Sequence, residues 1–305
     1  MQQQYHIPVL LDDVIDNLNI QPDGIYVDCT FGGGGHSKTI LSTLSTKGKL
    51  VAFDQDDDAR KNLPDDKRII FVPQNFRHLQ RFLRLHNITA VDGIMADLGV
   101  SSHQFDEADR GFSIRFNAEL DMRMDQRQTL TAFEVVNTYT EQRLHKLFEQ
   151  YGEVTNAKTL AKKIVDVRSI TSLKTIDGFK NALREIVKGN PNKYFAQVFQ
   201  ALRIEVNDEL GALKEMLEQI PSLLKPGGRV AIITFHSLED RLVKNFFRRS
   251  SFDEQPDENP FINTETVSEL KAVTKKPVLP SDEEMKKNPR SRSAKLRVAE
   301  KVMMV

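Results

Sequence analysis

Short apolar runs alternate with stretches of helical spacing over the first hundred residues of the chain. Strands that alternate with helices in this way form parallel sheets through right-handed βαβ units. The pattern therefore predicts an α/β fold, with a doubly covered parallel sheet. The predicted strands lie at 25–29, 50–54, 68–73 and 91–97, and the predicted helices lie at 36–46, 56–62 and 76–86.

A fifth strand of the same sheet is predicted at 229–235, after a long helical pattern at 204–224. Connections in α/β units usually span about 2–6 residues, so the long region before this strand should contain its own folded unit. That region has helical spacing and no convincing strand. We predict an inserted all-helical domain at 108–198, with 1–107 and 199–305 together forming the sheet domain.

The last part of the chain has a weaker pattern. Residues 251–292 are rich in Pro, Asp, Glu, Lys and Asn and lack periodicity, which predicts an extended or mobile segment. Residues 294–300 alternate and are predicted to form a final edge strand. The helix before this region is predicted to have Ser237 as its N-cap, with Asp240 at its third position.

Composition excludes several classes of protein. The 305 residues are 39% hydrophobic, and 43 basic residues cancel 43 acidic ones, so net charge does not indicate a nucleic-acid partner. The single cysteine, Cys29, excludes an internal disulfide and fits a reducing compartment. No apolar stretch approaches the ~20 residues of a membrane span, and no signal peptide is recognisable. We therefore expect a cytoplasmic protein. His6, His36 and His103 lack metal-ligand spacing, so we expect no metal.

The first predicted strand ends in Asp28 and is followed by four consecutive glycines, 32–35. Glycines allow positive φ and let a ligand lie directly on the backbone. A dinucleotide fingerprint has the form G-x-G-x-x-G/A, and the match here ends imperfectly at Ser37. The charge of Asp28 would repel a pyrophosphate but could receive a cationic amino group. S-adenosylmethionine carries an ammonium group and no phosphate, so it is favoured over NAD and an oxidoreductase is disfavoured.

Two further strands are followed by acids. Asp54 follows the second strand and is suited to accept hydrogen bonds from ribose hydroxyls. Asp97 ends the fourth strand. Its alternative role is to cap the turn that follows. Because the carboxyl ends of parallel strands share one edge, Asp28, Asp54 and Asp97 are expected on one rim. Phe76, after the third strand, could stack on an adenine ring or begin the core of the next helix.

Polar residues after the fourth and fifth strands are candidate substrate contacts. Ser101, Ser102 and Gln104 follow Asp97 and offer hydrogen bonds to substrate or cofactor. His236 follows the fifth strand and could contact substrate or bond to a backbone carbonyl. A hydrolase is only weakly indicated, because the chain has no G-x-S-x-G elbow.

Several segments together carry a family resemblance. They are 5–10, 28–37, 97–106, 110–113, 120–124, 199–207 and 235–241. With these motifs the chain resembles the RsmH (MraW) family of bacterial cytidine N4-methyltransferases of 16S ribosomal RNA. The resemblance extends from about residue 5 to the segment 290–297, nearly the whole chain.

The resemblance implies a Rossmann-like S-adenosylmethionine-dependent methyltransferase sheet with a helical insert. It implies transfer of a methyl group to the N4 amine of a cytidine in the decoding region of 16S ribosomal RNA, within the small ribosomal subunit and with no DNA or membrane partner. Cofactor contacts carried over by motif are Gly34, Gly35, His36, Asp54, Phe76, Asp97 and Gln104, to which the charge argument adds Asp28.

The amine of cytosine is a poor nucleophile, so alignment with the methyl group and an acceptor at the amine would be the main catalytic contributions. Asp97 is the candidate by position, and this role competes with the cofactor contact that the family implies. A ribosome-assembly factor that keeps the fold without turnover is the alternative from another class.

Two groups of basic residues are candidate RNA contacts. The first group could hold the RNA backbone, although Asp121 and Asp125 neutralise part of it and an ordinary solvated face is the alternative. The first group consists of Arg110, Arg115, Arg123 and Arg127, and the second of Lys286, Lys287, Arg290, Arg292 and Lys295.

Overall fold

The computed structural model describes residues 7–252 and 268–303. The chain divides into two compact units, which we describe separately. Unit 1 comprises Met1–Gly99 and Leu210–Val305, and unit 2 comprises Val100–Glu209. The start of the first resembling segment, including His6, lies outside the described residues.

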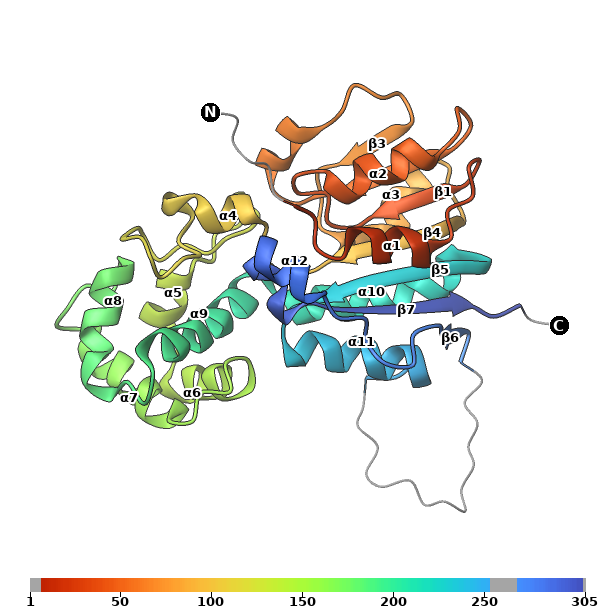
Figure 1. Cartoon of the computed structure of the whole chain (residues 1–305). Coiled ribbons are helices and arrows are strands. Elements are labelled where there is room, and N and C mark those ends of the chain that lie inside the picture. The colour runs from red at the N-terminus through yellow and green to blue at the C-terminus, as the bar shows by residue number, and fades with distance from the viewer. Residues whose placement is uncertain (1–6, 253–267, 304–305) are drawn as a thin grey trace, which may run out of the picture. The chain divides into compact units, whose positions relative to one another are not determined.

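Unit 1 contains a seven-stranded sheet in the order β3-β2-β1-β4-β5-β7-β6 (Figure 1). The first five strands in this order are parallel, and β7 runs antiparallel between β5 and β6. The strands are β1 (Ile25–Asp28), β2 (Lys49–Phe53), β3 (Ile69–Val72), β4 (Val91–Asp97), β5 (Leu224–Thr234), β6 (Leu270–Ala272) and β7 (Lys295–Lys301). The predicted Rossmann-like α/β sheet, including its distant fifth strand, is therefore confirmed.

Helices cover both faces of this sheet. On one face Val14 of α1 and Ile40 of α2 join a core with Tyr26 and Met95. On the other face α3, α10 and α11 pack against alternate residues of the same strands, such as Val27. The helices of unit 1 are α1 (Leu11–Leu18), α2 (Gly35–Thr43), α3 (Leu79–Leu85), α10 (Glu209–Leu223, from Leu210 onward), α11 (Ser237–Arg249) and α12 (Asp282–Lys287). No helix formed by the described residues is long and apolar enough to span a bilayer.

Several details of unit 1 differ from the sequence prediction. The helical pattern predicted at 204–224 is interrupted at Asp208, and β5 begins at Leu224, before the predicted start at 229. Residues 57–62 form a 3₁₀ helix, η1 (Asp57–Asn62), capped by the side chain of Asp56. The predicted edge strand near residue 295 is an interior strand, because β6 pairs with its outer side. The segment 251–292 is predicted to be extended or mobile, but its described part contains β6, α12 and the start of η5 (Pro289–Ser293). Residues 253–267 lie outside the described residues. Helix α12 is stabilised by Ser281, whose hydroxyl accepts from Glu284 N.

Unit 2 is helical, and all of its residues are described. They form no strand, only an isolated bridge between Glu119 and Thr175. Its helices are α4 (Ser102–Asp106), α5 (Ala132–Thr138), α6 (Glu141–Gln150), α7 (Ala157–Val167), α8 (Ile176–Leu183) and α9 (Pro191–Asn207), with short 3₁₀ turns η3 (Ala108–Arg110) and η4 (Arg184–Ile186). A single apolar core joins them, as their 3/4 spacing indicates.

The boundaries of unit 2 differ from those predicted. The prediction was 108–198, whereas the unit extends from Val100 to Glu209. The physical reason is packing: Phe105 contacts the core of unit 2, and Phe199, Leu202 and Val206 of α9 are buried in it.

Candidate functional site at the strand ends

The carboxyl ends of β1, β2 and β4 form the rim that the sequence predicted. Asp28 ends β1, Asp54 directly follows β2, and Asp97 ends β4. Strand β1 lies between β2 and β4, and all three are parallel. The chain order reverses direction between β1 and β4, which is where open α/β sheets bind ligands.

A glycine turn leads from β1 into α2. Gly32 and Gly34 have positive φ values of 50° and 75°, which glycine adopts without strain. A Cβ on Gly35 would lie 2.2 Å from Cγ of Pro8, so this glycine is required by packing. By contrast, a Cβ on Gly33 would meet no atom of the described residues within 4 Å. The turn is therefore open to a ligand at Gly33.

Asp28 is buried and forms hydrogen bonds within the protein. Its side chain is 1% exposed, and it accepts hydrogen bonds from Ser37 Oγ at 2.7 Å and from Thr30 N at 3.0 Å. Burial raises its pKa, and the two hydrogen bonds oppose that rise. Asp28 therefore joins the end of β1 to the first turn of α2, and its charge acts on the rim from inside the protein.

Asp54 holds the glycine turn from the neighbouring strand. Its Oδ2 accepts from Gly32 N at 2.7 Å, and its Oδ1 accepts from Asp56 N at 2.8 Å. Burial raises its pKa to about 7, and the charges of Asp56 and Asp28 add to the effect. Each carboxylate oxygen has a second lone pair, so Asp54 can still accept hydrogen bonds from a ligand.

Asp97 differs from the other two acids. Its backbone N donates to Thr30 Oγ1 at 2.6 Å, but its carboxyl oxygen Oδ1 is buried and has no hydrogen-bond partner among the described residues. Burial raises its pKa to about 8, with further contributions from Asp28 and Glu239. A buried acceptor without a donor is unfavourable by roughly 1–3 kcal/mol. The carboxyl of Asp97 thus retains one buried, unsatisfied oxygen at the end of β4.

The side chains of His36 and Phe76 also have packing roles. His36 Nε2 contacts the carbonyl oxygen of Val9 at 3.0 Å, and burial lowers its pKa to about 4. The His36 ring is therefore neutral and faces the protein, which leaves its backbone in the first turn of α2 as the part suited to a ligand. Phe76 is half-buried against the core of unit 1, so packing uses one part of its ring and leaves another part accessible.

At the end of β5, His236 caps helix α11. Its Nδ1 accepts from Glu239 N at 3.5 Å, and Glu239 Oε2 accepts from Phe235 N at 2.9 Å. The cap predicted at Ser237 with Asp240 is therefore wrong by one residue, because the imidazole occupies the N-cap position. His236 Nε2 lies 3.2 Å from Glu239 Oε1. Sequence reasoning missed Thr30 and Glu239. Histidine is not among the usual N-cap residues, so no capping pattern indicated the role of Glu239.

Ser101, Ser102 and Gln104 belong to unit 2, whereas the three acids belong to unit 1. Ser101 and Gln104 form a capping box at the start of α4: Ser101 Oγ accepts from Gln104 N, and Gln104 Oε1 accepts from Ser101 N. These contacts are local, as expected at a helix N-terminus. Ser102 Oγ is buried and has no partner among the described residues.

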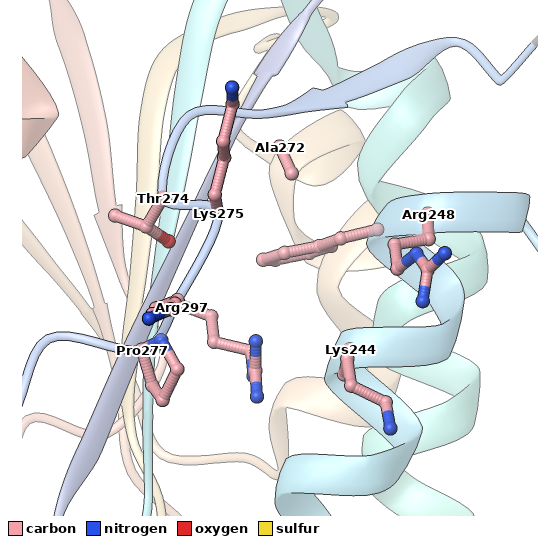
Figure 2. A pocket seen from close by; sticks show the side chains of 9 residues that line it. Lys244, Arg248, Ala272, Thr274, Lys275, Pro277 and Arg297 are labelled. Carbon is pink, nitrogen blue, oxygen red and sulfur yellow. The ribbon is translucent and has the colours of Figure 1, made fainter.

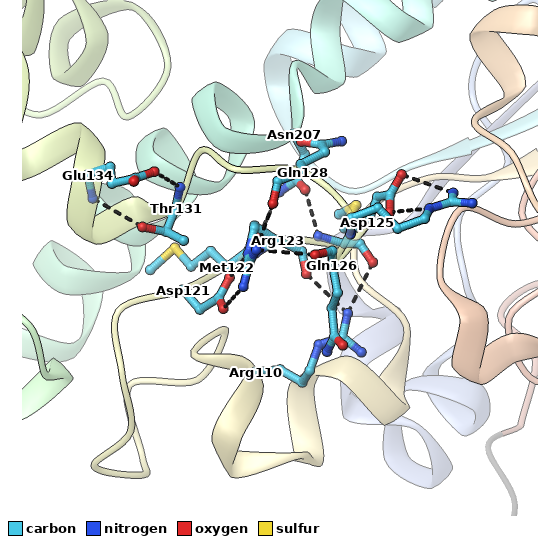
Figure 3. A network of polar contacts seen from close by, with 12 residues as sticks. Arg110, Asp121, Met122, Arg123, Asp125, Gln126, Gln128, Thr131, Glu134 and Asn207 are labelled. Atoms are coloured by element: carbon cyan, nitrogen blue, oxygen red, sulfur yellow. Dashed lines mark hydrogen bonds and ion pairs between the residues drawn. The ribbon is translucent and has the colours of Figure 1, made fainter.

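The arginines of the predicted basic series differ in accessibility. Figure 3 shows the contacts of Arg110 and Arg123. Arg110 is buried and donates to the carbonyl oxygens of Arg123 and Met124, both at 3.1 Å. Arg123 forms a bidentate ion pair with Asp121 at 2.8 Å and donates to Gln128 O at 2.6 Å. The structure therefore uses both guanidinium groups to hold the segment 121–128.

Asn207, at the end of α9, fixes the same segment from the other side. Its Oδ1 accepts from Met124 N at 2.7 Å, and its Nδ2 donates to Met122 O at 2.8 Å (Figure 3). Met122 has a positive φ of 64°, which a residue with a Cβ rarely adopts. The network maintains this local strain.

The other two arginines are more accessible. The side chain of Arg115 is 55% exposed and pairs with Asp106 at 3.2 Å; that of Arg127 is 45% exposed and pairs with Asp125 at 2.7 Å. In the second basic group, Lys287 pairs with Glu283 and Lys295 pairs with Asp240. The neutralisation predicted for the first group, by Asp121 and Asp125, is confirmed.

The raised pKa values of Asp54 and Asp97 predict a pH dependence of stability. Both carboxyls titrate near 3.8 when unperturbed, so between about pH 4 and about pH 8 the folded protein retains protons that the unfolded chain has released. The free energy of unfolding without cofactor should therefore fall as pH rises through this window, by at most about 1.4 kcal/mol per pH unit for each carboxyl.

Urea denaturation followed by circular dichroism at several pH values measures this slope. The substitution Asp97→Asn should reduce it, since one of the two titrating groups is removed. A variant whose stability falls with pH as steeply as that of the unsubstituted protein would contradict the assignment.

Known proteins are similar in sequence to this chain over nearly its full length. Over residues 3–302 the sequence matches the MraW methylase family. A Flavobacterium johnsoniae protein named ribosomal RNA small subunit methyltransferase H is 54% identical over 300 residues, which cover 98% of each chain. A protein of the same name from Phocaeicola vulgatus is 52% identical over 301 residues, again 98% of each chain.

Among solved structures, an rRNA methylase from Streptococcus thermophilus is 13% identical and covers 98% of this chain and 99% of its own, with a TM-score of 0.41. That score is too low to bear on function. The sequence matches confirm the family resemblance that the motifs indicated, and with it S-adenosylmethionine as the cofactor. The chain belongs to the MraW methylase family.

Proposed function

We propose that this protein transfers a methyl group from S-adenosylmethionine to the N4 amine of a cytidine in the decoding region of 16S ribosomal RNA. The observation that carries the proposal is the rim of unit 1, where an open glycine turn lies beside Asp54 and the unsatisfied carboxyl of Asp97. The names of the relatives support small-subunit ribosomal RNA as the substrate. The family resemblance of the motifs supports the cytidine amine and the decoding region.

The rim suits S-adenosylmethionine in three respects. The ribose hydroxyls can donate to the remaining lone pairs of Asp54. The backbone at Gly33 and the first turn of α2 offers a surface without side chains. The accessible part of Phe76 can pack on the adenine ring. The ligand's positive charge would favour the ionised forms of the buried acids, which lowers their pKa values again. The contact expected for Gln104 remains part of the proposal.

Methyl transfer to an exocyclic amine needs alignment more than acid or base strength. The nitrogen lone pair is delocalised into the ring, so holding the amine in line with the sulfur–methyl bond lowers the barrier. We assign to Asp97 the acceptor role at this amine, because its buried Oδ1 has no other partner among the described residues. A negative acceptor there would stabilise the positive charge that develops on nitrogen.

Unit 2 is the proposed RNA-recognition unit. The guanidinium carbon of Arg115 lies 5.4 Å from the ring centroids of both Phe105 and Phe116, and the side chain of Arg115 is 55% exposed. Aromatic rings and guanidinium planes are surfaces on which unpaired bases stack. Arg110 and Arg123, by contrast, would contribute to RNA binding indirectly, because they fix the conformation of the segment 121–128.

The direct test is incubation of the protein with labelled S-adenosylmethionine and small ribosomal subunits from a strain that lacks the modification. One cytidine should acquire the label, at N4, as mapped by mass spectrometry of nuclease fragments. Asp54→Asn should weaken cofactor binding by about 10-fold or more, as expected for loss of a charged hydrogen-bond acceptor. Asp65 is exposed, so Asp65→Asn is the matched control and should have no effect.

Two outcomes would contradict this function. A folded protein that binds S-adenosylmethionine but labels no RNA would be one of them. The other would be full complementation of the deficient strain by a variant that cannot bind the cofactor, since this would favour an assembly factor without turnover.

The role of Asp97 has a separate test. Asp97→Asn keeps the volume of the side chain but removes its charge, so kcat should fall by about 100-fold, while the Kd for S-adenosylmethionine stays within about 5-fold. Single-turnover kinetics and calorimetry measure the two quantities. A large rise in Kd with an unchanged single-turnover rate would instead assign Asp97 to the cofactor.

A further inference from the structure

A basic pocket lies in unit 1 between helix α11 and the end of β6 (Figure 2). It has a volume of about 220 Å³. None of the nine residues that line it is acidic, and five are cationic. The cationic residues are Lys244, Arg248, Lys275, Lys276 and Arg297. In a chain with no net charge, such a concentration of positive charge requires an explanation.

Four of these cations have no ion-pair partner among the described residues: Lys244, Arg248, Lys275 and Lys276. Arg297 is different, because it forms an ion pair with Asp240 at 2.6 Å. Most basic residues discussed above have an acidic partner nearby. Unpaired cations that converge on one hollow repel one another, and a bound anion would relieve this repulsion.

The frame of the pocket is well defined. Thr274 Oγ1 accepts from Val298 N at 3.0 Å, and Val273 N donates to Val298 O at 2.9 Å, so the segment after β6 is fixed to β7. Lys244 and Arg248 are four residues apart on α11 and therefore lie on one face of the helix. Phe247, between them, is 3% exposed and anchors that face in the core of unit 1. The charges are thus presented by rigid elements.

We propose that this pocket binds phosphate groups of the RNA backbone and forms a contact with the ribosomal RNA additional to the methylation site. The inference rests on the proposed function, since it takes ribosomal RNA as the substrate. Lysines and arginines that bind phosphates position an RNA but do not recognise its sequence. The lining of this pocket is of that kind.

The location of the pocket fits this role. Helix α11 begins at the rim, directly after His236, and Lys244 and Arg248 follow its first residue by seven and eleven positions. At about 1.5 Å per residue, the pocket lies about 10–16 Å along the helix from the strand ends. A folded RNA that presents one nucleotide at the rim extends over such a distance.

The test compares two double variants of the full chain. Lys275→Ala with Lys276→Ala removes two exposed cations of the pocket, and Lys67→Ala with Arg84→Ala removes two exposed cations elsewhere in unit 1. Affinity for unmodified small subunits is measured by filter binding over a range of salt concentrations. Calorimetry with S-adenosylmethionine confirms that each variant is folded.

The pocket variant should bind subunits about 10-fold more weakly at ~0.1 M salt, and the slope of log K against log salt should decrease in magnitude by about 1–2. The control variant should match the unsubstituted protein. Equal effects in the two variants would overturn the inference and leave the proposed function intact. Specific competition by inorganic phosphate, beyond that of chloride at equal ionic strength, would also overturn it, in favour of a free-phosphate site. If the unsubstituted protein binds subunits but does not methylate them, the proposed function is wrong. The affinity of the pocket variant for subunits would still test the proposed phosphate contact.

Discussion

The site depends on a small set of hydrogen bonds that join the ends of three parallel strands. Thr30 donates its N–H to Asp28 and accepts the N–H of Asp97 through Oγ1, while Asp54 accepts the N–H of Gly32. At the end of a strand, backbone N–H groups lose their ladder partners and must be satisfied in another way. Here the side chains of Asp28, Thr30 and Asp54, at or just after the ends of β1 and β2, provide those partners. The geometry of the rim and that of the turn are therefore fixed together.

The same arrangement makes the rim electrostatically unfavourable in the absence of a ligand. Three carboxyls are held at one sheet edge, and burial raises the pKa of each of them. A cation or hydrogen-bond donor bound at the rim would stabilise their charged forms. Perturbed carboxyls in a defined geometry are typical of functional sites, and here they favour a ligand that brings positive charge and hydroxyl groups. S-adenosylmethionine has both.

Much of the fold could be predicted because its signals are local. Apolar runs that end in acids indicated β1, β2 and β4, and the four glycines indicated the turn. The hydrogen-bond partners of individual polar side chains depend on tertiary contacts, which a local sequence pattern does not predict. The sequence indicated Arg110 and Arg123 as RNA contacts, yet in the structure they donate hydrogen bonds to the backbone of 121–128. His36 faces Val9, which is distant in the sequence. The pairing of β6 with β7 involves only three residues of β6, too few for a periodic signal.

We infer that the three buried carboxyls of the rim select a cationic methyl donor over a dinucleotide. Calorimetric titration of the unsubstituted protein with S-adenosylmethionine and, in parallel, with NAD tests this claim most directly. We expect saturable binding of about one equivalent of S-adenosylmethionine, with a Kd of roughly 1 mM or tighter, and no measurable heat with NAD. Binding of NAD by the folded protein, without binding of S-adenosylmethionine, would contradict it.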